Sequence, residues 1–203
     1  MDLLRERWRI TAFVTDGSYH GFDLQTTQYA LTDKPLLIQK YHYGGVAFRG
    51  RVRWLTAEDG DARKWEESSS KTLFREPSEF RNDIGSDRMK GNHEHARWVS
   101  FFTQNLGKPV TITVLCHRDN FRAPQAARLH PTKPYFVFSP CVDGEFIIDR
   151  EHPFTRLCLT GIETVLDNHR AMGSKGCLCR ARLLSESDDG SGGQVSPAEF
   201  GSE

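Results

Sequence analysis

The sequence has no excess of charge of either sign and no long hydrophobic run. Its 203 residues carry 27 basic and 27 acidic side chains. Non-specific nucleic-acid binding needs a surplus of Lys and Arg to displace counterions, so this balance argues against a nucleic-acid partner. The best apolar stretch, residues 110–115, is far shorter than the roughly 18 residues of a membrane-spanning helix. We therefore expect neither a nucleic acid nor a membrane as partner.

A secretory signal and a disulfide framework are also missing. The first residues read MDLLRERWR, without a long apolar core or a small-residue cleavage site. The cysteines number five, an odd count without regular spacing. We expect free thiols and a cytoplasmic chain, with export of a longer parent protein left open. Cys177 and Cys179 have no second pair that would complete four metal ligands.

Motifs of the commonest enzyme classes do not occur. The sequence contains no Gly-x-Ser-x-Gly elbow, no phosphate-cradling P-loop and no Gly-x-Gly-x-x-Gly. This removes the commonest hydrolase, nucleotide-binding and dinucleotide-binding hypotheses. We predict no cofactor.

What the chain does contain is a series of short segments with a hydrophobic period near two, which is typical of strands. Gly or Asp-Gly turns separate many of them, and no amphipathic helix stands out. This pattern predicts an all-β fold, an antiparallel β-sandwich. The expected strands lie within residues 8–14, 19–31, 36–43, 46–55, 96–102, 109–116, 135–138 and 145–149.

The remaining segments are less regular. Residues 56–92 are rich in charged side chains and show neither period, which predicts a long surface excursion. We place the β-sandwich domain at residues 1–153 and interpret residues 154–184 as a divergent or frameshifted segment. Residues 185–203 are acidic and rich in Gly and Ser, so we predict a disordered tail.

Two histidines at residues 93 and 95 are candidate metal ligands. On a strand, residues two apart face the same side, so both imidazoles could hold one divalent ion. His117 and Asn120 follow the next expected strand. The arrangement resembles the cupin motifs but lacks the Glu of the first motif, and its His-to-Asn step is three residues instead of four. Surface histidines are the alternative interpretation, and we predict no metal.

The segment from Lys40 to Gly50 reads KYHYGGVAFRG and carries the strongest functional signal. Two consecutive glycines permit a positive φ or a close backbone approach. The flat rings of Tyr41, His42 and Tyr43, beside the rigid donor fork of Arg49, are suited to hold a polyol or a carboxylate. A strand–bulge–strand core segment has the same composition, so structure and binding both stay open as explanations.

This segment resembles the Tyr-x-Tyr-Gly-Gly-x-x-x-Arg-Gly signature of the PmoA-like proteins, a bacterial family filed under "methane oxygenase PmoA". Residues 96–101 are similar to the family's Arg-Trp-Val-Asp strand, and residues 107–114 match the strand that follows. Residues 117–124, HRDNFRAP, stand where the family has a His-Pro-x-Asn-x-Arg-x-Pro loop. The resemblance covers roughly residues 8–153.

The resemblance implies a β-sandwich similar to part of the galactose-mutarotase supersandwich, whose concave sheet commonly binds carbohydrate. Family members are longer and begin with a His- and Trp-rich half that this chain lacks. Arg118 replaces a Pro of the family loop, and the family's strand after Pro153 is not recognisable. A methane oxygenase activity is not expected, because that enzyme's membrane subunit consists of spanning helices.

Three hypotheses follow from the residues and the resemblance. The first is a β-sandwich of the PmoA-like family with the carbohydrate-binding face that the resemblance implies, and with a histidine as proton donor if it is an enzyme. The second is an enzyme with a metal held by three histidines, and the third is a non-catalytic structural or interaction module. The candidate binding residues are Tyr41, Tyr43, Arg49 and Asn120, the candidate catalytic residues His42, His95 and His117, and the candidate metal ligands His93, His95 and His117.

Overall fold

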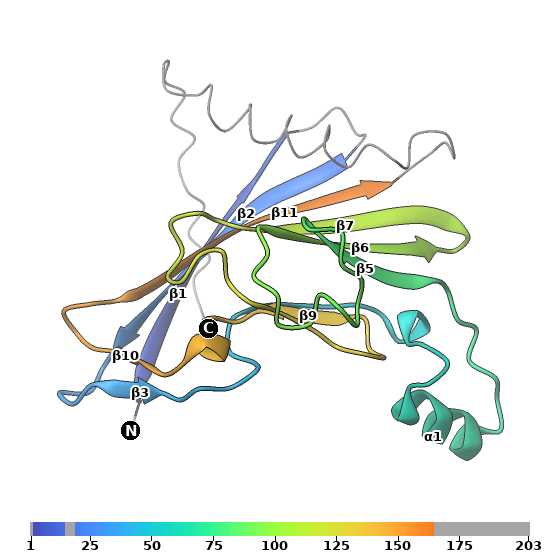
Figure 1. The fold of residues 1–203 in the computed structure, drawn as a ribbon, viewed down its shortest axis with the longest axis horizontal. Coiled ribbons are helices and arrows are strands. Elements are labelled where there is room, and N and C mark those ends of the chain that lie inside the picture. Colours follow the sequence, from blue (N-terminus) through green and yellow to red (C-terminus); the bar gives the residue numbers. More distant parts are fainter. Residues whose placement is uncertain (1, 15–18, 165–203) are drawn as a thin grey trace, which may run out of the picture. The chain divides into compact units, whose positions relative to one another are not determined.

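The computed structural model describes residues 2–14 and 19–164 of the chain. Its main element is a six-stranded antiparallel sheet in the order β1-β2-β11-β7-β6-β5 (Figure 1). The two middle strands, β11 and β7, pair with each other although they lie far apart in the sequence. The strands are β1 (Leu4–Ala12), β2 (Tyr19–Ala30), β11 (Phe154–Thr164), β7 (Lys108–Cys116), β6 (Trp98–Asn105) and β5 (Ser78–Asn82).

Two smaller antiparallel sheets face the six-stranded sheet. One has the order β4-β9-β8, formed by β4 (Val46–Arg49), β9 (Tyr135–Phe138) and β8 (Ala127–Leu129). The other pairs β10 (Phe146–Ile148) with β3 (Leu36–Ile38). In Figure 1 the β3–β10 pair and α1 lie at opposite ends of the long sheet. The predicted all-β, antiparallel sandwich is therefore confirmed.

The core lies between the long sheet and the β4-β9-β8 sheet, and the period of two explains it. On β7 the alternate residues Ile112, Val114 and Cys116 face inward, where β6 contributes Val99 and Phe101. The opposing sheet supplies further apolar side chains from β4, β8 and β9. Because β-branched and aromatic side chains pack well on a pleated surface, these segments form strands. The opposing side chains are Val46, Phe48, Ala127, Leu129, Phe136 and Phe138.

The segment 56–92 is an element of the fold and not a free surface excursion, which corrects the prediction. It contains α1 (Gly60–Ser69) and β5, the edge strand that pairs with β6. The helix buries only Ala62, and Phe80 is the one large apolar residue of β5. Neither element therefore carries a periodic apolar face that a sequence reading can detect.

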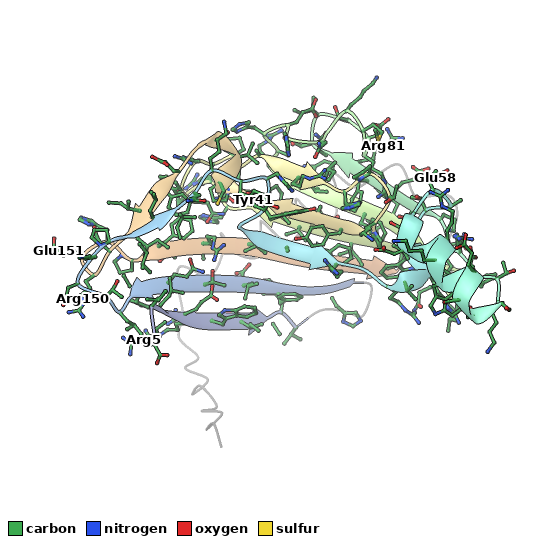
Figure 2. All side chains as sticks on the ribbon, turned by 90° about the horizontal axis from the view of Figure 1, so that it is seen from below. Arg5, Tyr41, Glu58, Arg81, Arg150 and Glu151 are labelled. Carbon is green, nitrogen blue, oxygen red and sulfur yellow. The ribbon has the colours of Figure 1, made fainter. Side chains whose placement is uncertain are left out.

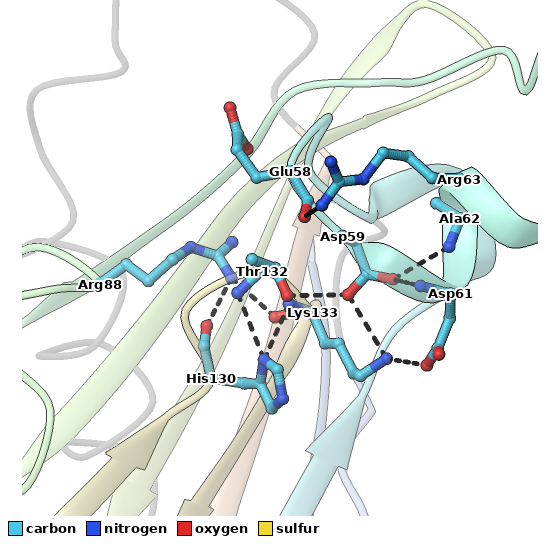
Figure 3. A network of polar contacts seen from close by, with 9 residues as sticks. All are labelled: Glu58, Asp59, Asp61, Ala62, Arg63, Arg88, His130, Thr132 and Lys133. Carbon is cyan, nitrogen blue, oxygen red and sulfur yellow. Dashed lines mark hydrogen bonds and ion pairs between the residues drawn. The ribbon is translucent and has the colours of Figure 1, made fainter.

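Asp59 attaches this segment to the turn between β8 and β9 (Figure 3). The buried carboxylate accepts hydrogen bonds from the amides of Asp61 and Ala62 at 3.0 and 3.1 Å, which caps the start of α1. Its other oxygen accepts a hydrogen bond of 2.7 Å from the hydroxyl of Thr132 and lies 3.4 Å from Nζ of Lys133. The network thus has a structural role.

Two glycines shape the loop between β3 and β4. Gly44 has φ +121°, and a Cβ added there would lie 2.6 Å from Sγ of Cys141. A Cβ on Gly45 would lie 1.6 Å from the carbonyl oxygen of Phe138. Both uses that the Gly-Gly pair permits, a positive φ and a close backbone approach, are therefore present.

Several strand assignments differ from the sequence prediction. The predicted strand 46–55 ends at Arg49 and is followed by a 3-10 helix at Val52–Trp54. The predicted strand 36–43 ends at Ile38, because the chain turns before Gly44. Residues 127–129, within a stretch predicted as loop, form β8. Residues 154–164 form β11 between β2 and β7, so the sheet domain extends beyond Pro153. The rest of the segment predicted as divergent, residues 165–184, and the predicted tail at 185–203 lie outside the described residues.

The described cysteines, Cys116, Cys141 and Cys158, are buried and free, as predicted. Burial raises the pKa of the Cys158 thiol to about 12. Cys177 and Cys179 lie outside the described residues. Within residues 2–14 and 19–164, no helix has the length and apolar character needed to cross a membrane.

Candidate functional site

The structure brings together four of the residues that the sequence singles out. Tyr41, His42 and Tyr43 lie on the loop that enters β4, and Arg49 ends that strand; Tyr41 is labelled in Figure 2. Tyr135 and Arg128 join them from β9 and β8, and neither was a sequence candidate. We call the set the tyrosine–arginine cluster: Tyr41, His42, Tyr43, Arg49, Arg128 and Tyr135.

Ring contacts run through the cluster. The His42 ring lies 4.1 Å from that of Tyr41 and 4.3 Å from that of Tyr43, between centroids. Tyr43 meets Tyr135 edge to face at 5.6 Å. Arg49 lies over the Tyr135 ring at 4.9 Å from its centroid, and Arg128 lies 5.8 Å from that of Tyr43. Cation–π contacts of this kind hold the two guanidinium groups beside the tyrosine pair.

Burial and neighbouring charges shift two pKa values at the cluster. Burial, reinforced by Tyr43, raises the pKa of Tyr135 above its ordinary value, although Arg49 and Arg128 act to lower it. At neighbouring His93, burial lowers the pKa, and the positive charge of Arg128 and then His42 add to the effect. The charge of Arg128 thus acts on both groups, in the direction that favours the deprotonated form.

The other predicted histidines lie elsewhere. His95 Nδ1 is 2.7 Å from the carbonyl oxygen of Pro124, and its Nε2 is 3.1 Å from Oδ1 of Asp143, so this side chain links two loops. His117 Nδ1 accepts a hydrogen bond from the amide of Asp119 within its own turn. Among the described residues, the hydrogen bonds of the His95 and His117 side chains join neither one to the other or to His42, and a catalytic role for the three stays a prediction.

Asn120 has a structural environment. It is buried, its amide group donates to the carbonyl of Leu157, and its carbonyl accepts from the amide of the same residue, both at 2.7 Å. These two bonds fasten the loop after β7 to β11. The side-chain amide group also donates to Sγ of Cys116 at 3.5 Å, so its contacts lie within the protein and nothing in its geometry favours a role in ligand binding.

The metal hypothesis is not supported by the described part of the chain. Within it, no group of three or more His, Cys, Asp or Glu side chains is arranged to hold a metal ion. The charges of Arg128 and His42 act on His93, while His95 contacts Asp143. The proposed ligand set His93, His95 and His117 is therefore wrong.

A groove of about 510 Å³ opens on the inner face of the long sheet, beside the Gly-Gly loop. Its floor consists of β1, β2 and β11, and one wall consists of the backbone and side chains of residues 44–47. Its volume is in the range of small-molecule sites. The remaining lining residues are Glu6, Trp8, Leu24, Thr26, Gln28, Ile38, Phe146, Phe154 and Arg156.

Three polar side chains form a strip across this floor. Oε1 of Glu6 accepts a hydrogen bond of 3.1 Å from Gln28 and one of 3.3 Å from Nη2 of Arg156. The Arg156 side chain is only 9% exposed and also lies over the ring of Phe154. Burial lowers its pKa, and Glu6 acts in the opposite direction. The pair leaves the strip without net charge.

Trp8 stands beside the polar strip and is 61% exposed. An indole that projects from a strand face normally gains free energy by being covered, so this exposure marks an incomplete contact. The floor of the groove also holds two buried polar atoms, Oγ1 of Thr26 and Nε of Arg156, that have no hydrogen-bond partner in the described structure. The inner face of β1 and β2 is thus less completely packed than the rest of the core.

Sequence reasoning missed this groove. In residues 8–14 the apolar side chains alternate along the chain, which places Trp8 on the apolar face of a strand. Nothing in this pattern indicates that no other element covers that face at Trp8. Arg156 belongs to the segment that the sequence assigned to a divergent region. A signal was available in the alternation of Phe154, Arg156 and Cys158, which is the period of a strand with a charge on its apolar face.

Comparison with known proteins gives a family but no activity. A model of a family of unknown function, DUF6807, matches residues 1–160, which extends from β1 into β11. No curated protein and no solved structure matches the chain. The resemblance to the PmoA-like proteins stays a prediction. The chain, by a match that covers nearly all of its described residues, belongs to the DUF6807 family.

Proposed function

We propose that this protein binds a carbohydrate, with one hydroxylated ring held in the groove on β1, β2 and β11. The observation that carries the proposal is the 61% exposure of Trp8 beside the polar strip of Glu6, Gln28 and Arg156. An open aromatic face next to fixed hydrogen-bonding groups is suited to a ligand that is apolar on one side and polar on its edge.

The charge of the strip favours a neutral ligand. Glu6 and Arg156 compensate each other at 3.3 Å, so an anion would meet the Glu6 carboxylate and a cation would meet the guanidinium. A purely apolar ligand would cover the polar strip without replacing its contacts with water. A hydroxyl group both donates and accepts, and it can bond to the carboxylate or to the amide of Gln28.

The rigid setting supports the same proposal. All three polar residues and Trp8 lie on paired strands, with Glu6 opposite Gln28 and Trp8 opposite Thr26. Side chains on strands are positioned more tightly than side chains on loops, which lowers the entropy lost when a ligand binds. The proposal concerns binding and names no reaction.

The test is a titration of the full chain with methyl β-glucopyranoside and with methyl β-galactopyranoside. The indole N–H signals in NMR spectra report binding at each ligand concentration. We expect saturable shifts of the Trp8 signal and a Kd of about 1 mM, which corresponds to about 4 kcal/mol. Trp8→Ala and Gln28→Ala should weaken binding at least about tenfold. Trp65→Ala is the matched control, because Trp65 is 44% exposed but lies on α1.

Two results would overturn the proposal. One is the absence of saturation by either glycoside at tens of millimolar. The other is binding that Trp8→Ala leaves unchanged, since the sugar would then lie elsewhere. The circular dichroism spectrum of each variant shows whether its strands have formed, and Gln28→Ala keeps the test valid if Trp8→Ala does not fold.

A further inference from the structure

We propose that the tyrosine–arginine cluster is a second ligand site, independent of the groove, and that it binds a carboxylate carried on a ring. Arg49 and Arg128 would hold the carboxylate, and the tyrosine rings would contact the ring of the ligand. A uronic acid residue is a ligand of this class. The groove proposal can fail without affecting this one, because the two sites share no side chain.

The cluster lies on the face of the β4-β9-β8 sheet that points away from the core. Phe48 and Phe136 pack into the core, so their strand neighbours Arg49 and Tyr135 project to the other face, where they stand directly opposite each other. Arg128 lies between the core residues Ala127 and Leu129 and therefore projects to the same face. Two guanidinium groups thus occupy one side of a small sheet.

Within the part of the chain that the structure describes, these two positive charges have no acidic partner. Among the described residues, no carboxylate oxygen lies within 4.0 Å of either guanidinium, whereas Arg75, Arg97 and Arg156 each pair with one. Arg128 donates from Nη1 to the side chain of Asn92 and to the carbonyl of Leu129, both neutral groups. The potential at the cluster is therefore positive and favours an anion.

The donors of Arg49 are free for such an anion. No described residue accepts a hydrogen bond from its guanidinium, which is held only by its contact with the Tyr135 ring at 4.9 Å. A cation–π contact uses the flat face of the guanidinium and leaves the N–H groups on its edge unoccupied. That edge matches the two oxygens of a carboxylate.

The aromatic rings favour a carboxylate on a ring over a small inorganic anion. Tyr41 is 56% exposed. A series of ring contacts joins it through His42 and Tyr43 to Tyr135, and we call these four rings the platform. Such a platform adds contact area only for a ligand that has a flat or aliphatic body. Inorganic phosphate is an anion without a ring, so it serves as the comparison ligand.

His93 provides a reporter that does not depend on the tyrosine rings. Burial, Arg128 and His42 hold its pKa below the ordinary value in the free protein. A carboxylate bound at Arg128 would offset the positive charge and raise that pKa. The shift identifies the position of the ligand and not only its affinity.

The experiment titrates the full chain with trigalacturonate and, separately, with inorganic phosphate and with neutral maltotriose. We expect saturable binding of trigalacturonate, at least about tenfold tighter than phosphate, and no binding of maltotriose at this site. NMR pH titrations should show a higher His93 pKa with trigalacturonate bound. Arg49→Ala should weaken trigalacturonate binding at least about tenfold.

Arg7→Ala is the matched control, since Arg7 also lies over a tyrosine, Tyr29, at 5.8 Å from the ring centroid, but on β1. Trp8→Ala should likewise leave trigalacturonate binding unchanged and so separates the two proposed sites. The inference is overturned if phosphate and trigalacturonate bind equally well, if Arg49→Ala binds as well as wild type, or if the His93 pKa does not rise. Arg49→Lys, which keeps the charge but loses the fork, should recover only part of the affinity.

Discussion

Arg156 on β11 and Glu6 on β1 form an ion pair at 3.3 Å that spans the intervening strand β2. The two residues are 150 positions apart in the sequence. Both residues line the groove on the inner face of the sheet, where the Arg156 side chain is 9% exposed and the Glu6 side chain 29%. Its energetic role can be separated from its proposed role in binding.

Glu6→Leu should destabilise the protein by about 3 kcal/mol, because it leaves a buried guanidinium without its compensating charge. The double variant Glu6→Leu/Arg156→Met should lie within about 1 kcal/mol of the wild type, since an apolar pair removes both charges together. Urea unfolding followed by circular dichroism measures both. Equal destabilisation of the single and the double variant would contradict this account of the pair.

Asp59 should make folding stability depend on pH in acid. Burial alone would raise the pKa of this carboxyl group, but the hydrogen bonds from Thr132 and the Ala62 amide and the ammonium group of Lys133 outweigh burial and hold it below its ordinary value of 3.8. A pKa that is lower in the folded state stabilises the fold above pH 3.8, and this contribution is lost as the pH falls toward the lower folded value.

The comparison that isolates this effect is Asp59→Asn, measured by urea unfolding at about pH 6 and about pH 3. At the higher pH the variant should be less stable than the wild type. At the lower pH the difference should shrink, because the wild-type carboxylate is then losing its charge. A difference between the two proteins that grows as the pH falls would reverse the sign and contradict the assignment.

The strands that sequence reasoning found are those in which alternate positions carry β-branched or aromatic residues. Residues 109–116 show this most clearly, and they form β7. β5, with one large apolar residue, does not show it, because its strand conformation depends on pairing with β6, which a local pattern cannot contain. β11 shows the alternation in Phe154, Arg156 and Cys158, but the charge of Arg156 interrupts its apolar face, and this strand was missed as well.

The same distinction holds for the candidate sites. The Gly-Gly loop and its rings lie within a few residues of one another, so the sequence could show that Tyr41, Tyr43 and Arg49 come together. Tyr135 enters only through the pairing of β9 with β4. The groove could not be predicted at all, because Trp8, Gln28 and Arg156 become neighbours only in the order β1-β2-β11.

Asn120 illustrates a residue that a motif offered for binding and that the fold uses for structure. Asn120→Ala removes two hydrogen bonds to the backbone of Leu157. The Leu157 amide then has no partner among the described residues, whereas the Leu157 carbonyl keeps its hydrogen bond of 3.4 Å from the amide of His117. We expect a loss of about 2 kcal/mol, or about 4–8 °C in Tm for a chain of this size. Binding of trigalacturonate and of the glycosides should be unchanged in the folded variant.

The control for this prediction is His117→Ala, since the His117 side chain is exposed and contacts Asp119 within its own turn. Its Tm should stay within about 2 °C of the wild type. Weaker ligand binding by folded Asn120→Ala, with a Tm equal to that of the wild type, would return Asn120 to the list of binding residues.

Three glycines allow the cost of crowding to be separated from the cost of backbone strain. Gly45→Ala places a Cβ 1.6 Å from a backbone oxygen and should destabilise the protein by more than about 4 kcal/mol or prevent folding. Gly85 has φ +89° with nothing within 4 Å, so Gly85→Ala should cost only about 1 kcal/mol from the left-handed conformation. Gly60→Ala, with neither problem at the start of α1, should stabilise by about 0.5 kcal/mol.

Urea unfolding ranks the three variants by their free energy of unfolding. The order shows whether folding requires the close approach of Gly45 to Phe138. If Gly45→Ala is the most costly, close approach to Phe138 is a requirement of folding, and the pair is needed whether or not a ligand binds beside it. If Gly45→Ala instead folds with a cost similar to that of Gly85→Ala, the loop can move away from β9. The wall of the groove and the position of Tyr43 would then be adaptable, and ligand binding at either site would have to include the free energy of ordering that loop.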